Sequence, residues 1–228
     1  MAINHLEGEH ILNEGSKTTK ERILTEALTL FSERGYESVT VAEIAKAVGV
    51  KAPALYKHYK SKQDIFDAIF DEMKLSYERQ TASMQMNGVD ASQDEALYQS
   101  SGEENIVKMS LNLFIYFLHE ENVRKFRKML VIEQYINKDL ATVFAERYVD
   151  FPMKYQSAVF SLMTGTGAAI SENAHIMALQ YYAPVFMYMT LCDFQPEREV
   201  EALTVLEQHF RQFIRLYNKK GNPNHENI

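Results

Sequence analysis

Residues 40–62 constrain the fold more than any other segment, because they hold two short helical patterns separated by a glycine. Thr40 and Glu43 have the spacing of a capping box, in which the hydroxyl and the carboxylate each accept a free backbone N–H at the start of a helix. Apolar residues follow at helical spacing until Gly49, which can adopt a positive φ at no steric cost. The segment therefore predicts two helices joined by a tight turn, which is the arrangement of a helix-turn-helix.

Helical periodicity continues along most of the chain. Thr18 and Glu21 repeat the capping-box spacing, and Gly35 follows the last turn of the helix that they start. Nine glycines and five prolines are few for a fold that needs many turns, so we predict an all-α protein of about nine helices. The expected helices cover 18–34, 41–48, 52–58, 61–83, 105–119, 122–136, 138–163, 173–191 and 196–219, with a loop over 85–104.

Charge divides the chain into three segments. Residues 1–16 carry three acids and no Lys or Arg, residues 17–62 carry nine Lys/Arg against five Asp/Glu, and residues 63–228 carry fifteen against twenty-three. A basic block on an acidic body is typical of a DNA-reading head, although chance clustering would give the same numbers. We predict a disordered tail over 1–16, a three-helix DNA-binding domain over 17–62, and a helical regulatory and dimerisation domain over 63–228.

The composition argues against several classes of protein. No apolar run approaches the ~18 residues that span a bilayer. Residues 1–16 lack the basic start and apolar stretch of a secretory signal, so we expect a cytoplasmic protein. Cys192 stands alone, and we interpret it as a buried inert thiol rather than a redox sensor. The histidines form no i,i+4 pair, and His119 beside two glutamates lacks a nucleophile. We therefore expect no enzyme, no cofactor and no metal site.

The segment from Thr40 to Lys62 and the helix before it resemble the tetracycline-repressor-like (TetR/AcrR) family of bacterial transcriptional regulators. The matching runs are FSERGY at 31–36, TVAEIA at 40–45, the glycine-valine turn, and LYKHYKSK at 55–62. The match covers about 17–66, and the rest is similar only in its length and helical architecture. The resemblance implies a homodimeric repressor that a small-molecule ligand releases from a palindromic operator in double-stranded DNA.

The resemblance also implies which residues contact DNA. In a helix-turn-helix, the first residues of the second helix meet base edges in the major groove, where Lys51 can donate to guanine. The other contacts are expected with phosphates. Each residue has an alternative: Tyr56 as a packed surface aromatic, His58 as a locally satisfied histidine, Thr40 as only a helix cap. The predicted DNA-binding residues are Thr40, Lys51, Ala52, Pro53, Ala54, Tyr56, Lys57, His58 and Lys62.

The body is rich in aromatic residues and methionine, with 13 Phe, 13 Tyr and 11 Met. Such residues can line a flexible apolar ligand cavity, although most of them are ordinary core in any protein. From the family's usual placement of its pocket, we expect an unidentified, largely apolar ligand to contact five residues. These are Tyr77, Phe114, Phe117, Tyr148 and Phe151, which lie outside the motif-matched region.

The last two helices are the predicted dimer interface, because family members pair there as a four-helix bundle. The helix over 196–219 carries a near-heptad apolar stripe, which suits packing along another helix. The alternative is that both helices bury these faces within one chain. The predicted interface residues are Ile176, Leu179, Ala183, Phe186, Leu203, Leu206, Phe210, Phe213 and Tyr217.

Two other interpretations stay open at this point. An architectural DNA-binding protein without an inducer would have a well-filled body. A ligand-binding or enzymatic body with a vestigial head is disfavoured by the intact, basic segment 40–62. The sequence does not name the inducer, the operator, the regulated genes or the sign of regulation.

Overall fold

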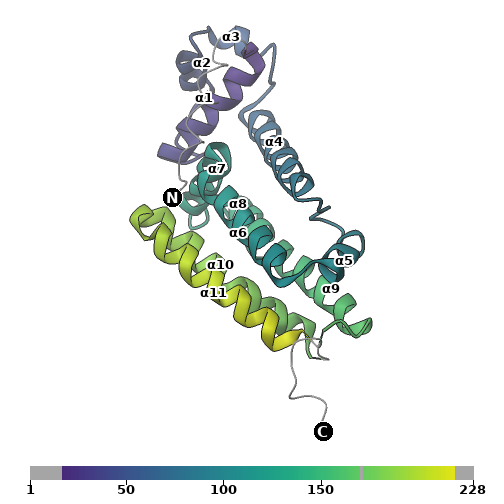
Figure 1. The fold of residues 1–228 in the computed structure, drawn as a ribbon. Coiled ribbons are helices and arrows are strands. Elements are labelled where there is room, and N and C mark those ends of the chain that lie inside the picture. Colours follow the sequence, from purple (N-terminus) through teal and green to yellow (C-terminus); the bar gives the residue numbers. More distant parts are fainter. Residues whose placement is uncertain (1–16, 170–171, 219–228) are drawn as a thin grey trace, which may run out of the picture. The chain divides into compact units, whose positions relative to one another are not determined.

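The computed structural model describes residues 17–169 and 172–218 of the 228-residue chain, and the predicted tail over 1–16 lies outside them. The described part is helical, without a β-strand and with one isolated bridge between Ala169 and Asn218. It confirms the predicted all-α fold. In chain order (Figure 1), the elements are α1 (Thr19–Arg34), α2 (Val41–Val48), α3 (Ala52–Leu55), α4 (Lys62–Ser83), α5 (Ala91–Ser100), α6 (Glu103–His119), α7 (Glu121–Glu133), α8 (Lys138–Ala145), the π-helical turn η1 (Glu146–Asp150), α9 (Phe151–Gly165), α10 (Ala174–Phe194), the 3-10 turn η2 (Pro196–Arg198) and α11 (Glu199–Tyr217).

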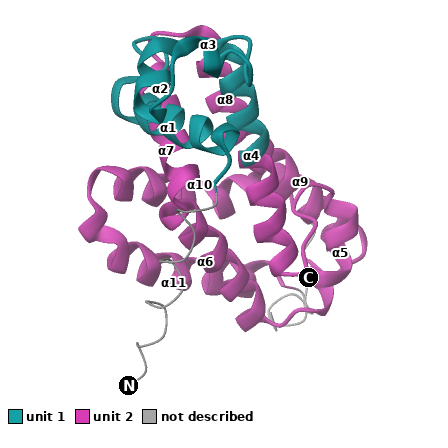
Figure 2. Ribbon diagram, turned by 90° about the horizontal axis from the view of Figure 1, so that it is seen from above, with its two compact units in different colours: residues 1–72 teal, residues 73–228 magenta. Residues whose placement is uncertain are grey.

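Two compact units divide the chain between Glu72 and Met73, and Figure 2 shows them in different colours. We call residues 1–72 unit 1 and residues 73–228 unit 2. Helix α4 runs through this boundary without interruption, so its first part belongs to unit 1 and its last part to unit 2.

Unit 1 packs α1, α2, α3 and the first part of α4 around one apolar core. Both predicted capping boxes form. The Thr18 hydroxyl accepts from the Glu21 N–H at 3.3 Å, and the Thr18 N–H donates to the Glu21 carboxylate at 2.7 Å. The box at Thr40 starts α2 in the same way. Fully buried side chains come from each of the four helices: Ile23, Phe31, Ile44, Leu55 and Ile65.

Unit 2 packs its helices around a second core and one buried ion pair. Helix α10 packs against α6, α9 and α11, and Figure 1 shows α10 and α11 side by side. The side chain of Arg127 in α7 is only 2% exposed. Its guanidinium donates to the Asp193 carboxylate of α10 at 2.7 and 2.6 Å, and to the Phe117 carbonyl of α6 at 2.7 Å. One arginine therefore joins three helices.

Helix α5 lies inside 85–104, where we expected a loop, so this prediction was wrong. The Asp90 carboxylate caps the helix by accepting the N–H of the second residue after it at 3.0 Å. The Asp94 carboxylate is buried and accepts two backbone N–H groups of the preceding turn at 2.6 and 2.7 Å. The helix depends on these polar contacts and on packing against α9. A search for apolar periodicity misses such a helix.

Two expectations from composition concern Cys192 and membrane spans. Cys192 is buried, as predicted, and this burial raises the pKa of its thiol. A raised pKa lowers the thiolate fraction, and the thiolate is the reactive form. Among the described residues, no helix is long and apolar enough to cross a membrane.

Candidate functional site

The turn between α2 and α3 produces the predicted helix-turn-helix geometry. Gly49 adopts φ 77° and ψ 29°, the left-handed conformation, which costs other residues about 1–2 kcal/mol. The Val50 N–H closes α2 by donating to the Ala45 carbonyl at 2.9 Å. Leu55 anchors α3 in the core. Helix α3 ends there, and residues 56–58, which we predicted as helical, form turns.

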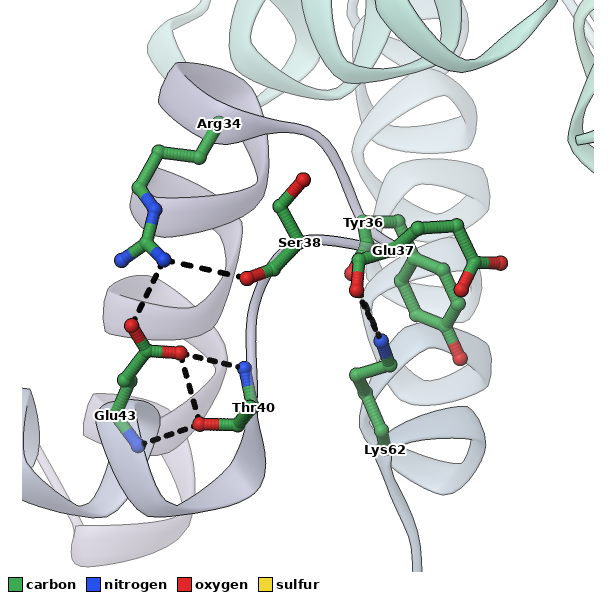
Figure 3. Close-up of polar contacts among 7 residues, drawn as sticks. All are labelled: Arg34, Tyr36, Glu37, Ser38, Thr40, Glu43 and Lys62. Atoms are coloured by element: carbon green, nitrogen blue, oxygen red, sulfur yellow. Dashed lines mark hydrogen bonds and ion pairs between the residues drawn. The ribbon is translucent and has the colours of Figure 1, made fainter. Parts of the chain in front are cut away.

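The start of α2 is fixed to the end of α1 by Glu43, as Figure 3 shows. The Thr40 hydroxyl accepts the Glu43 N–H at 3.3 Å, and the Thr40 N–H donates to the Glu43 carboxylate at 2.8 Å. Arg34 Nη2 donates to the same carboxylate at 2.8 Å. The hydrogen bonds from Thr40 and then from Arg34 lower the pKa of Glu43 to about 2. Thr40 is thus an exposed helix cap at the N-terminus of α2, where a phosphate would be favoured.

Lys62 lies at the first position of α4 and contacts the loop between α1 and α2 (Figure 3). Its ammonium donates to the Tyr36 carbonyl at 2.9 Å and to the Glu37 carbonyl at 3.4 Å. It also lies 4.2 Å from the centre of the Tyr36 ring, a cation–π contact. These contacts give Lys62 a structural role in unit 1, and its predicted phosphate contact stays a prediction.

The other predicted DNA-contacting residues form a basic surface over α3 and the turn that follows it. No Asp or Glu occurs between Glu43 and Asp64 in the sequence, while the same stretch contains five lysines. A phosphate backbone approaching this surface would meet cations and hydrogen-bond donors, and residues 44–63 themselves contribute no carboxylate. The exposed members are Lys51, Pro53, Tyr56, Lys57 and His58, and the half-buried members are Ala52 and Ala54.

Unit 2 contains a largely apolar cavity of about 110 Å³ among α4, α6, η1, α9 and α10. The structure brings all five predicted ligand-contacting residues to its wall. Tyr77 lies 6.2 Å from both Phe117 and Phe151, and Phe117 lies 6.3 Å from Tyr148, measured between ring centres. The predicted residues in the lining are Tyr77, Phe114, Phe117, Tyr148 and Phe151.

Hydrogen bonds orient the tyrosines of this wall. Tyr77 donates to the Gly88 carbonyl at 3.0 Å, and Tyr155 donates to the buried Asp94 carboxylate at 2.6 Å. Burial raises the pKa of the Tyr77 and Tyr155 hydroxyls well above their usual value, so both stay neutral donors at physiological pH. The turn before α5 therefore connects α4 with α9 at one edge of the cavity.

Sequence reasoning missed several lining residues, and those with polar side chains are Tyr98, Ser110, Arg147, Tyr155, Gln156, Tyr181 and Tyr182. Tyr148, Phe151 and Tyr155 follow one another at steps of three and four, so a helical projection would have found Tyr155. Arg147 precedes them in η1, a π-helical turn within the stretch that we predicted as one continuous helix. Regular helical spacing does not predict its position.

The dimer prediction needs a correction in α11. Leu206, Phe210 and Phe213 are 0%, 1% and 5% exposed within the single chain, and Phe213 lies 5.3 Å from Phe160, between ring centres. A side chain that is already buried has no surface to offer a partner. The near-heptad stripe is therefore the face that α11 turns toward its own core, which is the alternative considered above. Leu203 and Tyr217 are half-buried.

The opposite faces of α10 and α11 are exposed and partly apolar. In α10, Ile176 and Leu179 are 46% and 48% exposed, Ala183 is exposed and Phe186 is half-buried. Their neighbour Met187 is also exposed. In α11, the exposed apolar residues are Val200, which begins the near-heptad stripe, and Val205 and Leu216, which lie outside it.

Comparison with known proteins identifies the N-terminal segment. Residues 23–69 match the family model described as "Bacterial regulatory proteins, tetR family". The chain is 40% identical over 70 residues to the HTH-type transcriptional regulator AcrR of Shigella flexneri, which is 28% of this chain and 33% of that protein. It is 46% identical over 48 residues to the biofilm operon negative regulator IcaR of Staphylococcus aureus (strain Newman), which is 21% of this chain and 26% of that protein. The matches thus span a third or less of these relatives.

Solved structures extend the likeness to the whole fold. The SmeT–triclosan complex has a TM-score of 0.65 at 18% identity, covering 90% of this chain and 94% of that chain. NalD, the secondary repressor of a multidrug efflux pump in Pseudomonas aeruginosa, has a TM-score of 0.60 at 18% identity, covering 88% and 96%. At such identity the likeness shows the shared fold.

Proposed function

We propose that this chain, a member of the tetR family of bacterial regulatory proteins through its residues 23–69, is a DNA-binding transcriptional repressor that a small ligand releases from its operator. The observation that carries the proposal is the helix-turn-helix in which α3 and the turn after it expose lysines and contain no Asp or Glu. The names of AcrR and IcaR describe transcriptional regulators, and that of IcaR a negative one. Such a protein would act in the cytoplasm, where the DNA is.

On DNA, Lys51 at the start of α3 would read guanine, and the short side chains of Ala52 and Ala54 would approach a thymine methyl. Tyr56, Lys57 and His58 would hold phosphates, which positions the protein without reading sequence. A dimer would set two such heads about 34–36 Å apart, in successive major grooves of a palindrome.

The cavity of unit 2 supports control by a ligand, and it favours a regulator over an architectural DNA-binding protein with a well-filled body. Two structural neighbours are relevant. One is named as a complex with triclosan and another as a flavonoid-responsive regulator. We infer that an apolar ligand in this cavity shifts the protein toward a form with lower operator affinity. A coupling of ~1–3 kcal/mol would change that affinity about 5- to 150-fold.

The dimer interface that we propose is the exposed face of α10 and α11 rather than the buried stripe. It comprises Ile176, Leu179, Ala183 and Met187 of α10 with Val205 and Leu216 of α11. An exposed apolar face of this kind is typical of a surface that is covered in an assembly.

The test is selection from a random duplex library with the purified full chain at two salt concentrations. We expect a palindrome with half-sites about 10 base pairs apart, and an affinity that falls steeply with salt because phosphate binding releases counterions. The variant Leu179→Asp should remain folded, become monomeric in light scattering and lose the palindrome, whereas Arg124→Gln, an exposed change in α7, should retain both properties. No enrichment at low salt by a folded dimer would contradict DNA recognition by this protein alone.

A further inference from the structure

The π-helical turn η1 presents two adjacent polar residues, Arg147 and Tyr148, to the cavity of unit 2. π-helical turns are rare and are frequently found at functional sites. We propose that this cavity selects a small aromatic weak acid, such as a phenol, and that Arg147 and Tyr148 bind its anionic oxygen. The inference rests on the proposed ligand-controlled function and adds the chemical class of the ligand.

The charge of the lining favours an anion. Arg147 is the only charged residue among the described residues that line the cavity, where no Asp or Glu is present. Electrostatic interactions are strong in such a surrounding of low polarity. Burial raises the pKa of Tyr77 and Tyr148, and the charge of Arg147 opposes this rise at both hydroxyls. The Asp94 carboxylate acts in the opposite direction at Tyr77, so the field of Arg147 favours an anionic oxygen and disfavours an organic cation at the Tyr148 end of the cavity.

The hydroxyl of Tyr148 is the one in the cavity wall that has no protein acceptor among the described residues. Tyr77 and Tyr155 use their hydroxyls on protein acceptors, as described above. Tyr148 is 1% exposed, and its hydroxyl, which lies beside the donor Arg147, has no acceptor for its proton among the described residues. A buried donor without a partner is unfavourable. A ligand oxygen at this point would satisfy it and would lie beside the guanidinium of the preceding residue.

The size and walls of the cavity restrict the rest of the ligand. Its volume of about 110 Å³ is of the order of an engineered apolar cavity of ~150 Å³ that binds benzene. The walls are mostly aromatic and aliphatic, and rings favour edge or offset contact with other rings. One small ring system bearing a single anionic group matches both the volume and the single charged side chain that the described residues contribute to the lining.

Arg147 also touches the helix that both units share. Its Nη2 donates to the Met73 carbonyl of α4 at 3.1 Å. Helix α4 continues from this residue into the core of unit 1 without a break. An anionic oxygen that draws the guanidinium toward the cavity would weaken this hydrogen bond. The ligand would therefore bind differently to the form in which this hydrogen bond is made and to the form in which it is broken. Such a difference is what allows a ligand to shift a conformational equilibrium.

The test uses three probes of similar size on the full-length protein: 4-nitrophenol, its neutral methyl ether 4-nitroanisole, and the cation trimethylphenylammonium. By calorimetry we expect 4-nitrophenol to bind best and the cation worst. The visible absorbance of bound 4-nitrophenol should shift toward that of its ionised form. Arg147→Gln should weaken 4-nitrophenol about tenfold to a hundredfold and leave 4-nitroanisole nearly unchanged. Tyr148→Phe should weaken 4-nitrophenol by roughly threefold to tenfold.

Controls separate this inference from the loss of the fold and from the proposed function. Arg147→Lys keeps the charge and should retain most of the preference, and Arg124→Gln removes a charge outside the cavity lining and should change nothing. Absence of 4-nitrophenol binding to the folded protein, equal binding of the ether, or equal weakening of both by Arg147→Gln would overturn the inference. If the probe pattern holds but no operator is selected, the cavity inference is supported and the regulatory function is overturned.

Discussion

The capping contacts that start α1 and α2 in unit 1 join residues close together in the sequence, whereas several polar contacts between the helices of unit 2 join residues far apart. In unit 1, each capping box joins residues three apart, such as Thr40 and Glu43. In unit 2, Arg127 bonds a residue 66 positions later, and Tyr155 bonds Asp94 across 61 positions. A short-range contact forms with its own helix, whereas a long-range contact needs the assembled unit. The starts of the helices in unit 1 are thus encoded locally, whereas the packing around the cavity of unit 2 depends on residues far apart in the sequence.

The largest expected effect comes from breaking a long-range contact. Arg127→Met should destabilise unit 2 by about 3–5 kcal/mol, because it leaves the Asp193 carboxylate without its partner. Urea unfolding followed by circular dichroism measures this loss. The double variant Arg127→Met with Asp193→Leu should recover much of it, since replacing both charges by apolar groups removes the unpaired carboxylate.

An exposed pair supplies the contrast for this first prediction. Glu201→Gln removes the pair of Arg198 with Glu201, which lies at the surface of the same unit. It should change stability far less than Arg127→Met does, because solvent screens an exposed ion pair. Equal losses from Arg127→Met and Glu201→Gln would mean that the long-range contact does not hold the body together.

A smaller effect is expected from the turn of the helix-turn-helix. Gly49→Ala introduces a side chain where φ is 77° and where no atom lies within 4 Å of the new Cβ, so the cost is conformational alone. We expect a loss of about 1 kcal/mol in chemical denaturation. Gly165→Ala, in a helix and also without a close neighbour, should instead stabilise by about 0.5–1 kcal/mol. A stabilising Gly49→Ala would refute the left-handed turn.

The smallest effect concerns pH and the cap of α2. The pKa of Glu43 is about 2 in the folded protein, against an ordinary value of 4.5. A lowered folded pKa means that this carboxylate stabilises the fold fully above about pH 4.5 and loses that contribution as the pH falls toward 2. Thermal melts across this window should therefore decline less for Glu43→Gln than for the wild type. Parallel declines would mean that the carboxylate is not engaged.

The separation along the sequence between the residues in contact also decides what could be predicted from the sequence. Both capping boxes, the turn at Gly49 and the bounds of α2 follow from neighbouring residues, and the structure confirms them. Helix α5 was not predicted because its stability comes from Asp94 and from packing, not from a periodic apolar face. The stripe of α11 was read correctly as apolar but assigned to the wrong contact. Periodicity identifies an apolar face that will be buried, but it does not show whether that face packs against the same chain or against a second copy of it.

The sequence allowed us to predict that aromatic residues line the cavity, but not that Arg147 does. Five aromatic residues taken from the family's usual pocket do line it. Arg147 lies in a π-helical turn, where each hydrogen bond spans one residue more than in an α-helix, and this changes the direction of the side chains. That change arises from the packing of the whole unit, which a single sequence does not display.

The distribution of tyrosines gives the protein a built-in optical reporter. The chain contains thirteen tyrosines and no tryptophan, so its intrinsic emission comes from tyrosine alone and is not lost by energy transfer to indole. Six of these tyrosines line the cavity: Tyr77, Tyr98, Tyr148, Tyr155, Tyr181 and Tyr182. A compound entering there contacts nearly half of the fluorophores at once. The unlabelled protein can therefore be used to screen compound collections by its own ultraviolet fluorescence.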